Sequence, residues 1–280
     1  MPDIWKIAGV QFDCKRGAVA LNLEFMVAKL RATAAAGARL TVFPECALAG
    51  YCFDSKAEAL PFAETIPGRA TDTVQAICNQ HNNYTLFGML EREGEDLFNS
   101  AVLIGPEGVI GSYRKTHLPF LGVDRYVTPG NRPYQVYEID GLRLGVLICF
   151  DGSFPEAPRI LALLGADLIV LPTNWPQGAR CSADHIPPMR AHENHVYFMA
   201  VNRVGDEGGF KFIGQSRVTD WNGQDLAIAP EPREAIVYAQ IDPSKARQKR
   251  VVFVPGAYEV DRIAGRRPEL YGPLVERKSQ

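Results

Sequence analysis

Two stretches of this chain carry nearly the same sequence: residues 37–44 read GARLTVFP and residues 165–172 read GADLIVLP. Each stretch is the last part of a longer segment. That segment begins with a continuous apolar run, continues with apolar residues at helical spacing, and ends with a second apolar run. These segments predict strand, helix and strand at 6–12, 22–36 and 40–43, and again at 143–150, 155–164 and 168–171. That order predicts parallel strands joined by a right-handed crossover, so we expect an α/β fold that contains this unit twice.

The repeat also aligns Glu45 with Thr173, each directly after the shared proline. In open α/β sheets, ligands bind at the carboxyl ends of the parallel strands. Both residues are therefore expected at a ligand-binding edge. Chance similarity between two apolar strands is the competing explanation of the repeat.

The rest of the chain is organised as one unit. Further strands are predicted at 84–89, 100–104, 109–113, 196–201, 214–219 and 234–240. No low-complexity linker or block of like charge divides the sequence, which favours a single domain over residues 1–280. The charged, proline-containing tail at 255–280 shows little apolar periodicity, so we expect a surface arm or a subunit contact.

Composition argues against several kinds of partner. The 30 basic and 32 acidic residues give a net charge of −2, which disfavours nucleic acid or a membrane surface bound by bulk charge. No apolar run approaches the roughly 18 residues of a membrane span. The first residues lack a secretory signal pattern, so the cytoplasm is the expected compartment and the six cysteines are expected to be free thiols.

Familiar cofactor and metal motifs are absent from the sequence. It contains no Walker phosphate loop, no G-x-G-x-x-G fingerprint and no G-x-S-x-G elbow. His192 and His195 are three residues apart, where the zinc-protease motif needs four. We interpret them as a polar helix end, and the sequence predicts neither a metal site nor a cofactor.

Cys149 has the most reactive setting among the cysteines. It ends the apolar run RLGVLIC and precedes a Gly/Ser turn and a helix that starts with proline. A helix start presents free backbone N–H groups, which lower a thiol pKa and can hold an oxyanion. A cysteine is ordinarily a small buried hydrophobe, but this turn favours a nucleophile that attacks a carbonyl-like carbon.

A nucleophilic thiol needs a base, and the five histidines sit at no obvious strand end. Glu45 does follow a strand, and a partly desolvated carboxyl with a raised pKa can take the thiol proton and return it to a leaving amine. Lys115 follows the strand at 109–113 and can supply positive charge to an oxyanion. Each of these charges, taken alone, is more commonly a solvated surface residue.

Three segments, FPE at 43–45, YRKTHLP at 113–119 and ICFDGSFPE at 148–156, resemble in their order the nitrilase, or carbon–nitrogen hydrolase, superfamily. The resemblance covers nearly the whole chain and includes KIAGVQF, LPTNW, RAHEN and NRVG. It implies a four-layer α-β-β-α sandwich, a homodimer or higher homo-oligomer, and a triad without a metal. On this resemblance Glu45 is the general base, Lys115 the oxyanion stabiliser and Cys149 the nucleophile of a thioester mechanism.

Many members of the superfamily place a second glutamate in the loop after the lysine motif, where this chain offers only Asp124. An aspartate reaches about 1.5 Å less far than a glutamate. Asp124 is predicted either to orient the substrate amide or Lys115, or to cap the loop before Pro129 and Gly130. The resemblance places six further residues around the substrate: Tyr51, His117, Phe150, Thr173, Asn174 and Trp175.

The residues after the nucleophile bear on the substrate. Nitrilases of the superfamily tend to carry Trp-Glu there, whereas this chain has Phe150 and Asp151, a pair more like amidases and carbamoyl-amide hydrolases. The expected partner is a small amide or nitrile, and hydrolysis of an amide to carboxylate and ammonia is favoured. A nitrilase or an N-carbamoyl amide hydrolase is the alternative, although the first arginine after Cys149 is Arg159. A catalytically silent oligomeric scaffold is the non-enzymatic alternative.

Overall fold

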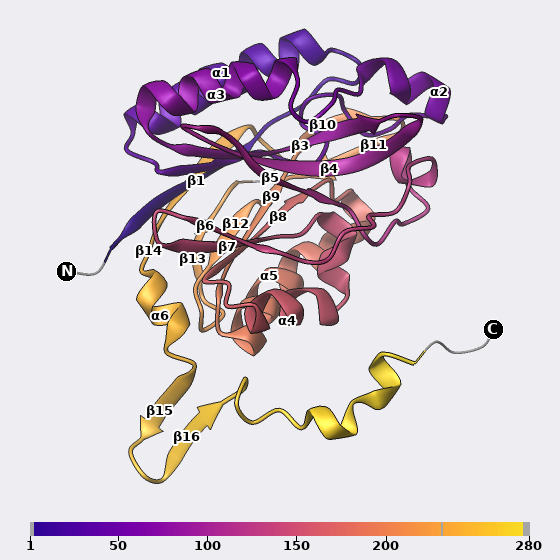
Figure 1. Ribbon diagram of the computed structural model, residues 1–280. Coiled ribbons are helices and arrows are strands. Elements are labelled where there is room, and N and C mark those ends of the chain that lie inside the picture. Colours follow the sequence, from indigo (N-terminus) through magenta and orange to yellow (C-terminus); the bar gives the residue numbers. More distant parts are fainter. Residues whose placement is uncertain (1–2, 231, 277–280) are drawn as a thin grey trace.

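Two six-stranded sheets lie face to face, and helices cover the outer face of each (Figure 1). The computed structural model describes residues 3–230 and 232–276. The first sheet consists of β1 (Trp5–Gln11), β2 (Leu40–Val42), β3 (Tyr84–Glu93), β4 (Asp96–Gly105), β5 (Gly108–Arg114) and β14 (Ala235–Ile241). The second sheet consists of β6 (Val136–Ile139), β7 (Leu142–Val146), β8 (Leu168–Thr173), β9 (Tyr197–Asn202), β12 (Arg217–Thr219) and β13 (Asp225–Ile228).

The outer layers confirm the predicted four-layer α-β-β-α sandwich. They consist of α1 (Val19–Ala35) and α3 (Arg69–His81) over the first sheet, and of α4 (Glu156–Leu163) and α5 (Arg180–Asn194) over the second. In α1 the buried Leu23, Met26 and Leu30 recur at helical spacing and form the face that packs on the sheet. The remaining elements are α2 (Lys56–Ala59), α6 (Pro243–Arg247), and the hairpins β10 (Val204–Glu207) with β11 (Phe210–Ile213) and β15 (Arg250–Val254) with β16 (Tyr258–Asp261).

The two sheets repeat one strand order, which confirms the internal symmetry predicted from the sequence. In the first sheet β1, β2 and β3 are parallel and β4 and β5 follow antiparallel. In the second sheet β7, β8 and β9 are parallel and β12 and β13 follow antiparallel. The registers correspond as well, because Ile7 pairs with Leu40 and Leu144 pairs with Leu168, the matching leucine of the repeat.

Apolar side chains fill the spaces between the layers. One core cluster joins residues of both sheets and continues under α4 and α5. A second cluster lies between the first sheet and the helices α1 and α3. Because the two halves of the chain share the first cluster, the strand ends of one half are held in a fixed place relative to those of the other.

The second unit departs from the prediction around Cys149. The strand expected at 143–150 ends at Val146, because the chain turns into a 3-10 helix, η3 (Cys149–Ser153). The carboxylate of Asp151 stabilises this turn by accepting a hydrogen bond from the N–H of Ile148 at 3.0 Å. Cys149 therefore begins a turn, with a φ of 46°, and does not end a strand.

The C-terminal segment leaves the sandwich after α6 and runs beside it as an arm (Figure 1). It carries large exposed apolar side chains, among them Phe253, Tyr258, Leu270 and Leu274. The arm agrees with the surface location expected for 255–280, of which residues 277–280 lie outside the described residues. Within the described part of the chain, none of the helices combines the length and the apolar character needed to span a bilayer.

Candidate active site

Four strand ends bring the predicted catalytic residues together. Glu45 follows β2, Lys115 follows β5, Cys149 follows β7, and Thr173 ends β8. The Nζ atom of Lys115 lies 2.6 Å from Oε1 of Glu45. Glu45, Lys115 and Thr173 each shift the pKa of Cys149, so all four side chains belong to one site.

The turn that carries Glu45 is fixed by its close approach to β3. The N–H of Gly88 donates to the carbonyl of Pro44 at 3.1 Å. A Cβ atom on Gly88 would lie 2.4 Å from the nitrogen of Cys46 and 2.6 Å from Cα of Glu45, closer than such atoms can pack. The absence of a side chain at this position therefore lets the Glu45 backbone lie directly against the sheet.

A fully buried cluster of charges forms the centre of the site. Lys115 binds Oε1 of Glu45 and, on its other side, the carboxylate of Asp124. Asn99 on β4 joins the two carboxylates, because its Nδ2 donates to Glu45 at 2.7 Å and to Asp124 at 2.8 Å. The side chains of Glu45, Lys115 and Asp124 are all inaccessible to solvent. One ammonium thus compensates two carboxylates away from water.

Burial and charge set the protonation of this cluster. Burial raises the pKa of Glu45, and the Asp124 carboxylate raises it further against the opposing effect of Lys115. Burial lowers the pKa of Lys115, but Asp124 and Glu45 outweigh it and hold this pKa well above its usual value. Lys115 is therefore an ammonium at neutral pH, while Glu45 takes up a proton more readily than an exposed glutamate does. A carboxyl of this kind suits general acid–base catalysis.

Burial favours the protonated form of the Cys149 thiol. Burial raises its pKa to about 12, and the Glu45 carboxylate contributes to the rise. Lys115, the Thr173 hydroxyl and the N–H of Asn174 act in the opposite direction. The expectation that the helix start lowers this pKa is wrong, because the sulfur is buried beside a carboxylate. The thiol consequently needs a base before it can attack.

The backbone of the Cys149 turn is strained and held from two sides. A φ of 46° is a left-handed conformation that costs a non-glycine residue about 1 kcal/mol, and such strain concentrates at functional sites. Arg190 of α5 donates from Nε to the carbonyl of Gly152 at 2.9 Å. The buried Asp151 binds the N–H groups of Ile148 and His117 at 3.0 Å each. Contacts from outside the turn thus keep Cys149 in this conformation.

The residues expected around the substrate occupy different depths. Tyr51 is buried, and its hydroxyl donates to Asp124 at 2.7 Å. His117 and Phe150 lie beside the Cys149 turn and are partly exposed, and His117 stacks on Phe154 with ring centroids 3.8 Å apart. The Nδ1 atom of His117 is 2.8 Å from the Asp151 carboxylate.

The chain after β8 supplies the other three predicted residues. Thr173 is fully buried and lowers the pKa of the Cys149 thiol. Asn174 donates from Nδ2 to the backbone carbonyl of Glu45 at 3.0 Å. Trp175 packs in the core that joins the two sheets. The structure thus brings Thr173 and Asn174 to the catalytic cluster, and contact of each pocket residue with substrate stays a prediction.

Sequence reasoning missed Asn99 and underestimated Asp124. Asn99 contacts the carboxylates of Glu45 and Asp124, and the signal for it is a polar pair, Asn99 and Ser100, inside a largely apolar strand. Asp124 reaches Lys115 despite its shorter side chain, because the short 3-10 helix η2 (Gly122–Arg125) brings its backbone inward. The side chain of Asp124 contacts Tyr51, Asn99 and Lys115, as expected for a residue that orients Lys115 and not for one that only caps the loop.

The histidine pair at the end of α5 has structural contacts. His192 lies in the last turn of this helix, and its ring nitrogens contact the carbonyl of Asn222 and the guanidinium of Arg262. His195 adopts the left-handed conformation that ends the helix, with a φ of 51°. The interpretation as a polar helix end is confirmed. Over residues 3–230 and 232–276, the structure groups no three His, Cys, Asp or Glu side chains as a metal site would.

Replacement of Asp124 by asparagine should shift the pH dependence of hydrolysis. Asp124 raises the pKa of both Glu45 and Lys115. Its loss should therefore move the acid and alkaline limbs of kcat/KM to lower pH, and kcat should fall by about tenfold or more because Lys115 loses its second partner. Initial rates across pH measure this, with the exposed Asp54→Asn as the control. Limbs that stay in place with wild-type kcat would show that Asp124 does not act on the pair.

A thiol on a strained turn, with a buried carboxyl and a buried ammonium from two other strand ends, forms an arrangement suited to nucleophilic acyl transfer. The chain belongs to the carbon-nitrogen hydrolase family, whose model matches residues 6–251. It is 39% identical to a nitrilase of Pyrococcus abyssi, over 77% of this chain and 81% of the relative. It is 30% identical to an N-carbamoylputrescine amidase of Solanum lycopersicum, over 96% of this chain and 94% of the relative.

Solved structures share the fold. A carbon-nitrogen hydrolase from Helicobacter pylori superimposes with a TM-score of 0.86 and 23% identity, over 98% of this chain and 99% of that one. A mutant of an amidase from Nesterenkonia sp. superimposes with a TM-score of 0.79 and 23% identity, over 95% of each chain. That amidase structure shows covalent addition of the acetamide moiety of fluoroacetamide at the active-site cysteine. At this identity the likeness establishes the α-β-β-α fold.

Proposed function

We propose that this carbon–nitrogen hydrolase cleaves a small amide to a carboxylate and ammonia through a thioester on Cys149. One observation carries the proposal: the buried Glu45 and Lys115 pair lies beside the Cys149 thiol, and among the described residues Oε2 of Glu45 has no hydrogen-bond partner. Buried polar atoms in folded proteins are normally paired. An oxygen left free at this place is available for the protons that the reaction must move.

In the first step Sγ of Cys149 bonds to the amide carbon while its proton passes to Oε2 of Glu45. Burial raises the pKa of both the thiol and the carboxyl, so Glu45 accepts a proton more readily than a glutamate does in water. Negative charge develops on the carbonyl oxygen. The ammonium of Lys115 stabilises this charge, and it is fixed by two carboxylates before the substrate arrives.

In the second step the C–N bond breaks as Glu45 returns the proton to the leaving nitrogen. Ammonia departs and the acyl group remains on Cys149 as a thioester. Water then gives a proton to Glu45 and adds to the thioester carbon. When the C–S bond breaks, Glu45 returns that proton to the sulfur, and the carboxylic acid leaves. Protons, atoms and charge balance over the cycle, and the enzyme returns to its resting state.

Two kinds of relative bear on this choice. The adduct at the cysteine of the Nesterenkonia amidase supports a nucleophilic cysteine in a site that admits a small amide. The names of the relatives also include nitrilase and N-carbamoylputrescine amidase, so hydrolysis of a nitrile or of an N-carbamoyl amine is the second candidate. Oδ1 of Asn174 is another buried oxygen that has no hydrogen-bond partner among the described residues. An amide or ureido group carries N–H groups that such an oxygen accepts, and a nitrile carries none. This favours the amide over the nitrile.

A substrate panel tests the proposal. Ammonia release is measured from short aliphatic amides, the nitriles of the same carbon chain, and N-carbamoyl amines, with Cys149→Ala as the blank. We expect kcat/KM to be highest for an amide, and a preserved thioester on Cys149 to be detectable by mass spectrometry after acid quench. Preference for the matched nitrile or carbamoyl compound would replace the amide by that substrate class.

We also propose that the chain works as a homodimer or a larger homo-oligomer in the cytoplasm. The exposed apolar residues of the arm and a groove of about 850 Å³ between α4 and the arm support an assembly. All six cysteines are free thiols, as expected in a reducing compartment. Light scattering measures the mass in solution, and a value of 30.9 kDa, that of one chain, would contradict the assembly.

A further inference from the structure

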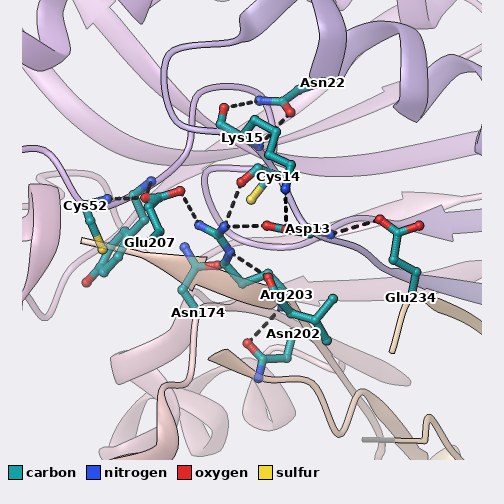
Figure 2. A network of polar contacts seen from close by, with 12 residues as sticks. Asp13, Cys14, Lys15, Asn22, Cys52, Asn174, Asn202, Arg203, Glu207 and Glu234 are labelled. Atoms are coloured by element: carbon teal, nitrogen blue, oxygen red, sulfur yellow. Dashed lines mark hydrogen bonds and ion pairs between the residues drawn. The ribbon is translucent and has the colours of Figure 1, made fainter. Parts of the chain in front are cut away.

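A buried ion pair lies between the two halves of the molecule, away from the reacting thiol. Arg203 joins β9 to β10 and is fully buried, and its Nη1 donates to Oε2 of Glu207 at 2.6 Å (Figure 2). On its other side Nη2 donates to the Cys14 carbonyl at 2.7 Å and to Asp13 at 3.1 Å. Figure 2 shows the guanidinium between Glu207 and Asp13. Arg203, in the second half of the chain, thus binds residues 13–14 of the first half.

The second carboxylate oxygen of Glu207 binds the backbone of residues 51–52. Oε1 accepts hydrogen bonds from the N–H of Tyr51 at 2.7 Å and from the N–H of Cys52 at 2.5 Å. The carboxylate can come this close because residue 50 is a glycine. A Cβ there would lie 3.0 Å from Oε2 of Glu207 and 2.6 Å from Cα of Arg16, and its φ of 83° disfavours other residues.

Tyr51 connects Glu207 to the buried charge cluster of Glu45, Lys115 and Asp124. Its N–H is held by Glu207, its carbonyl accepts from the N–H of Val123 at 2.8 Å, and its hydroxyl donates to Asp124 at 2.7 Å. Asp124 in turn binds Lys115. The chain of contacts therefore runs from Glu207 to the ammonium through one residue, Tyr51, which is held at its N–H, its carbonyl and its hydroxyl.

Asn202, the residue before Arg203, is linked to Glu45 through the backbone of residues 174–175. Asn202 Oδ1 accepts from the N–H of Trp175 at 2.8 Å, and its Nδ2 donates to the Trp175 carbonyl at 3.3 Å. The neighbouring Asn174 binds the backbone carbonyl of Glu45 at 3.0 Å. Asn202 and Arg203 are thus each linked to the catalytic pair through other residues, Asn202 through the chain at 174–175 and Arg203 through Glu207.

Stability alone is a poor explanation for this arrangement. Taking two charges out of water costs free energy that their attraction offsets only in part, so a buried ion pair contributes little net stability compared with apolar packing. Fixing the geometry of reacting groups has a much larger effect, since a displacement of about 1 Å can cost about 100-fold in rate.

We propose that Glu207, held by Arg203, is a positioning residue for amide hydrolysis: it fixes Tyr51 so that the Tyr51 hydroxyl keeps Asp124 against Lys115. Glu207 does not touch the reacting atoms and acts through Tyr51. The inference rests on the proposed function for its rate measurements, but its effect on Lys115 can be measured without any substrate.

The test compares Glu207→Gln with Asp13→Asn, which removes the other carboxylate from the same arginine without touching Tyr51. Glu207→Gln should lower kcat by about 10- to 100-fold with KM within about threefold, because positioning and not binding is lost. Its alkaline limb of kcat/KM should shift to lower pH, because Lys115 loses part of the contact with Asp124 that raises its pKa. Asp13→Asn should lower only the melting temperature.

A double-mutant cycle shows whether Tyr51 carries the effect. In a Tyr51→Phe background, which lacks the hydroxyl, Glu207→Gln should lower kcat by less than about threefold, since coupled residues are not additive. An equal loss in both backgrounds would overturn the inference. So would a normal kcat and pH profile in Glu207→Gln with only a lower melting temperature. Should that variant fail to fold, Glu207→Asp keeps the charge, withdraws it by one methylene, and is judged by the same criteria.

Alkylation of Cys149 by iodoacetamide separates this inference from the proposed function. Lys115 lowers the pKa of Cys149, so a displaced Lys115 should move the pH profile of alkylation upward in Glu207→Gln and leave that of Asp13→Asn unchanged. A shifted profile in a protein that hydrolyses no amide would contradict the proposed function alone. An unshifted profile would overturn the role of Glu207 even if amides are hydrolysed.

Discussion

Cys149→Ala should abolish hydrolysis and leave the fold intact. Removal of a nucleophile closes the covalent route, which typically costs about 10⁴-fold or more in kcat. Alanine accepts the φ of 46° at this position about as poorly as cysteine does, so the backbone strain is unchanged. Ammonia release with the best amide of the panel, together with a melting curve, measures both parts.

The other cysteines are the controls for this result. Cys46 lies next to Glu45, Cys52 binds Glu207 through its N–H, and Cys181 is exposed. Replacement of each by alanine should retain measurable activity. Ordinary turnover by Cys149→Ala, or loss of all turnover in Cys181→Ala alone, would overturn the assignment of the nucleophile.

Lys115→Met should lower kcat by about 10²–10³-fold, since this is the usual loss when one oxyanion-stabilising donor is removed. The variant should also be less stable by about 3–5 kcal/mol, because Glu45 and Asp124 remain buried without their common counterion. One of the two carboxyls is then expected to bind a proton, so the loss of stability should be smaller at acid pH. Rates per folded molecule and urea unfolding at two pH values measure these effects.

Lys249→Met is a matched control for Lys115→Met. Lys249 is half-buried, and burial lowers its pKa to about 8, but it binds the carbonyls at the end of α5. Its replacement should reduce stability and spare kcat. If Lys115→Met behaved in the same way, Lys115 would be a structural residue of the carboxylate pair and not an oxyanion stabiliser.

Hydrophobic periodicity was sufficient to predict the repeated strand, helix and strand unit, because each unit buries a continuous apolar pattern of its own. The four-layer sandwich was implied by the family resemblance. Glu45, Lys115 and Cys149 could be found for a related reason, since each follows a strand that the pattern marks. The burial of these side chains could not be predicted from the strand pattern. The thiol pKa was therefore predicted in the wrong direction, because desolvation of Cys149 depends on side chains from both sheets.

Contacts between segments that are far apart in the sequence could not be predicted either. Glu207 binds the backbone of Tyr51 across 156 positions of sequence, and neither residue stands in a local pattern that points to the other. Asn99 is a similar case, since its two carboxylate partners come from separate loops. Polar residues inside apolar strands indicate that a buried network exists, but only the three-dimensional structure shows which groups it joins.

The paired sheets carry one reaction centre where their symmetry would allow two. In the first half Glu45 occupies the position that Thr173 takes in the second, and the strand registers equate Cys149 of the second half with Phe12 of the first. The first half carries the carboxyl proposed as the acid–base group and the second half carries the sulfur, so the complete site exists only where the two halves meet.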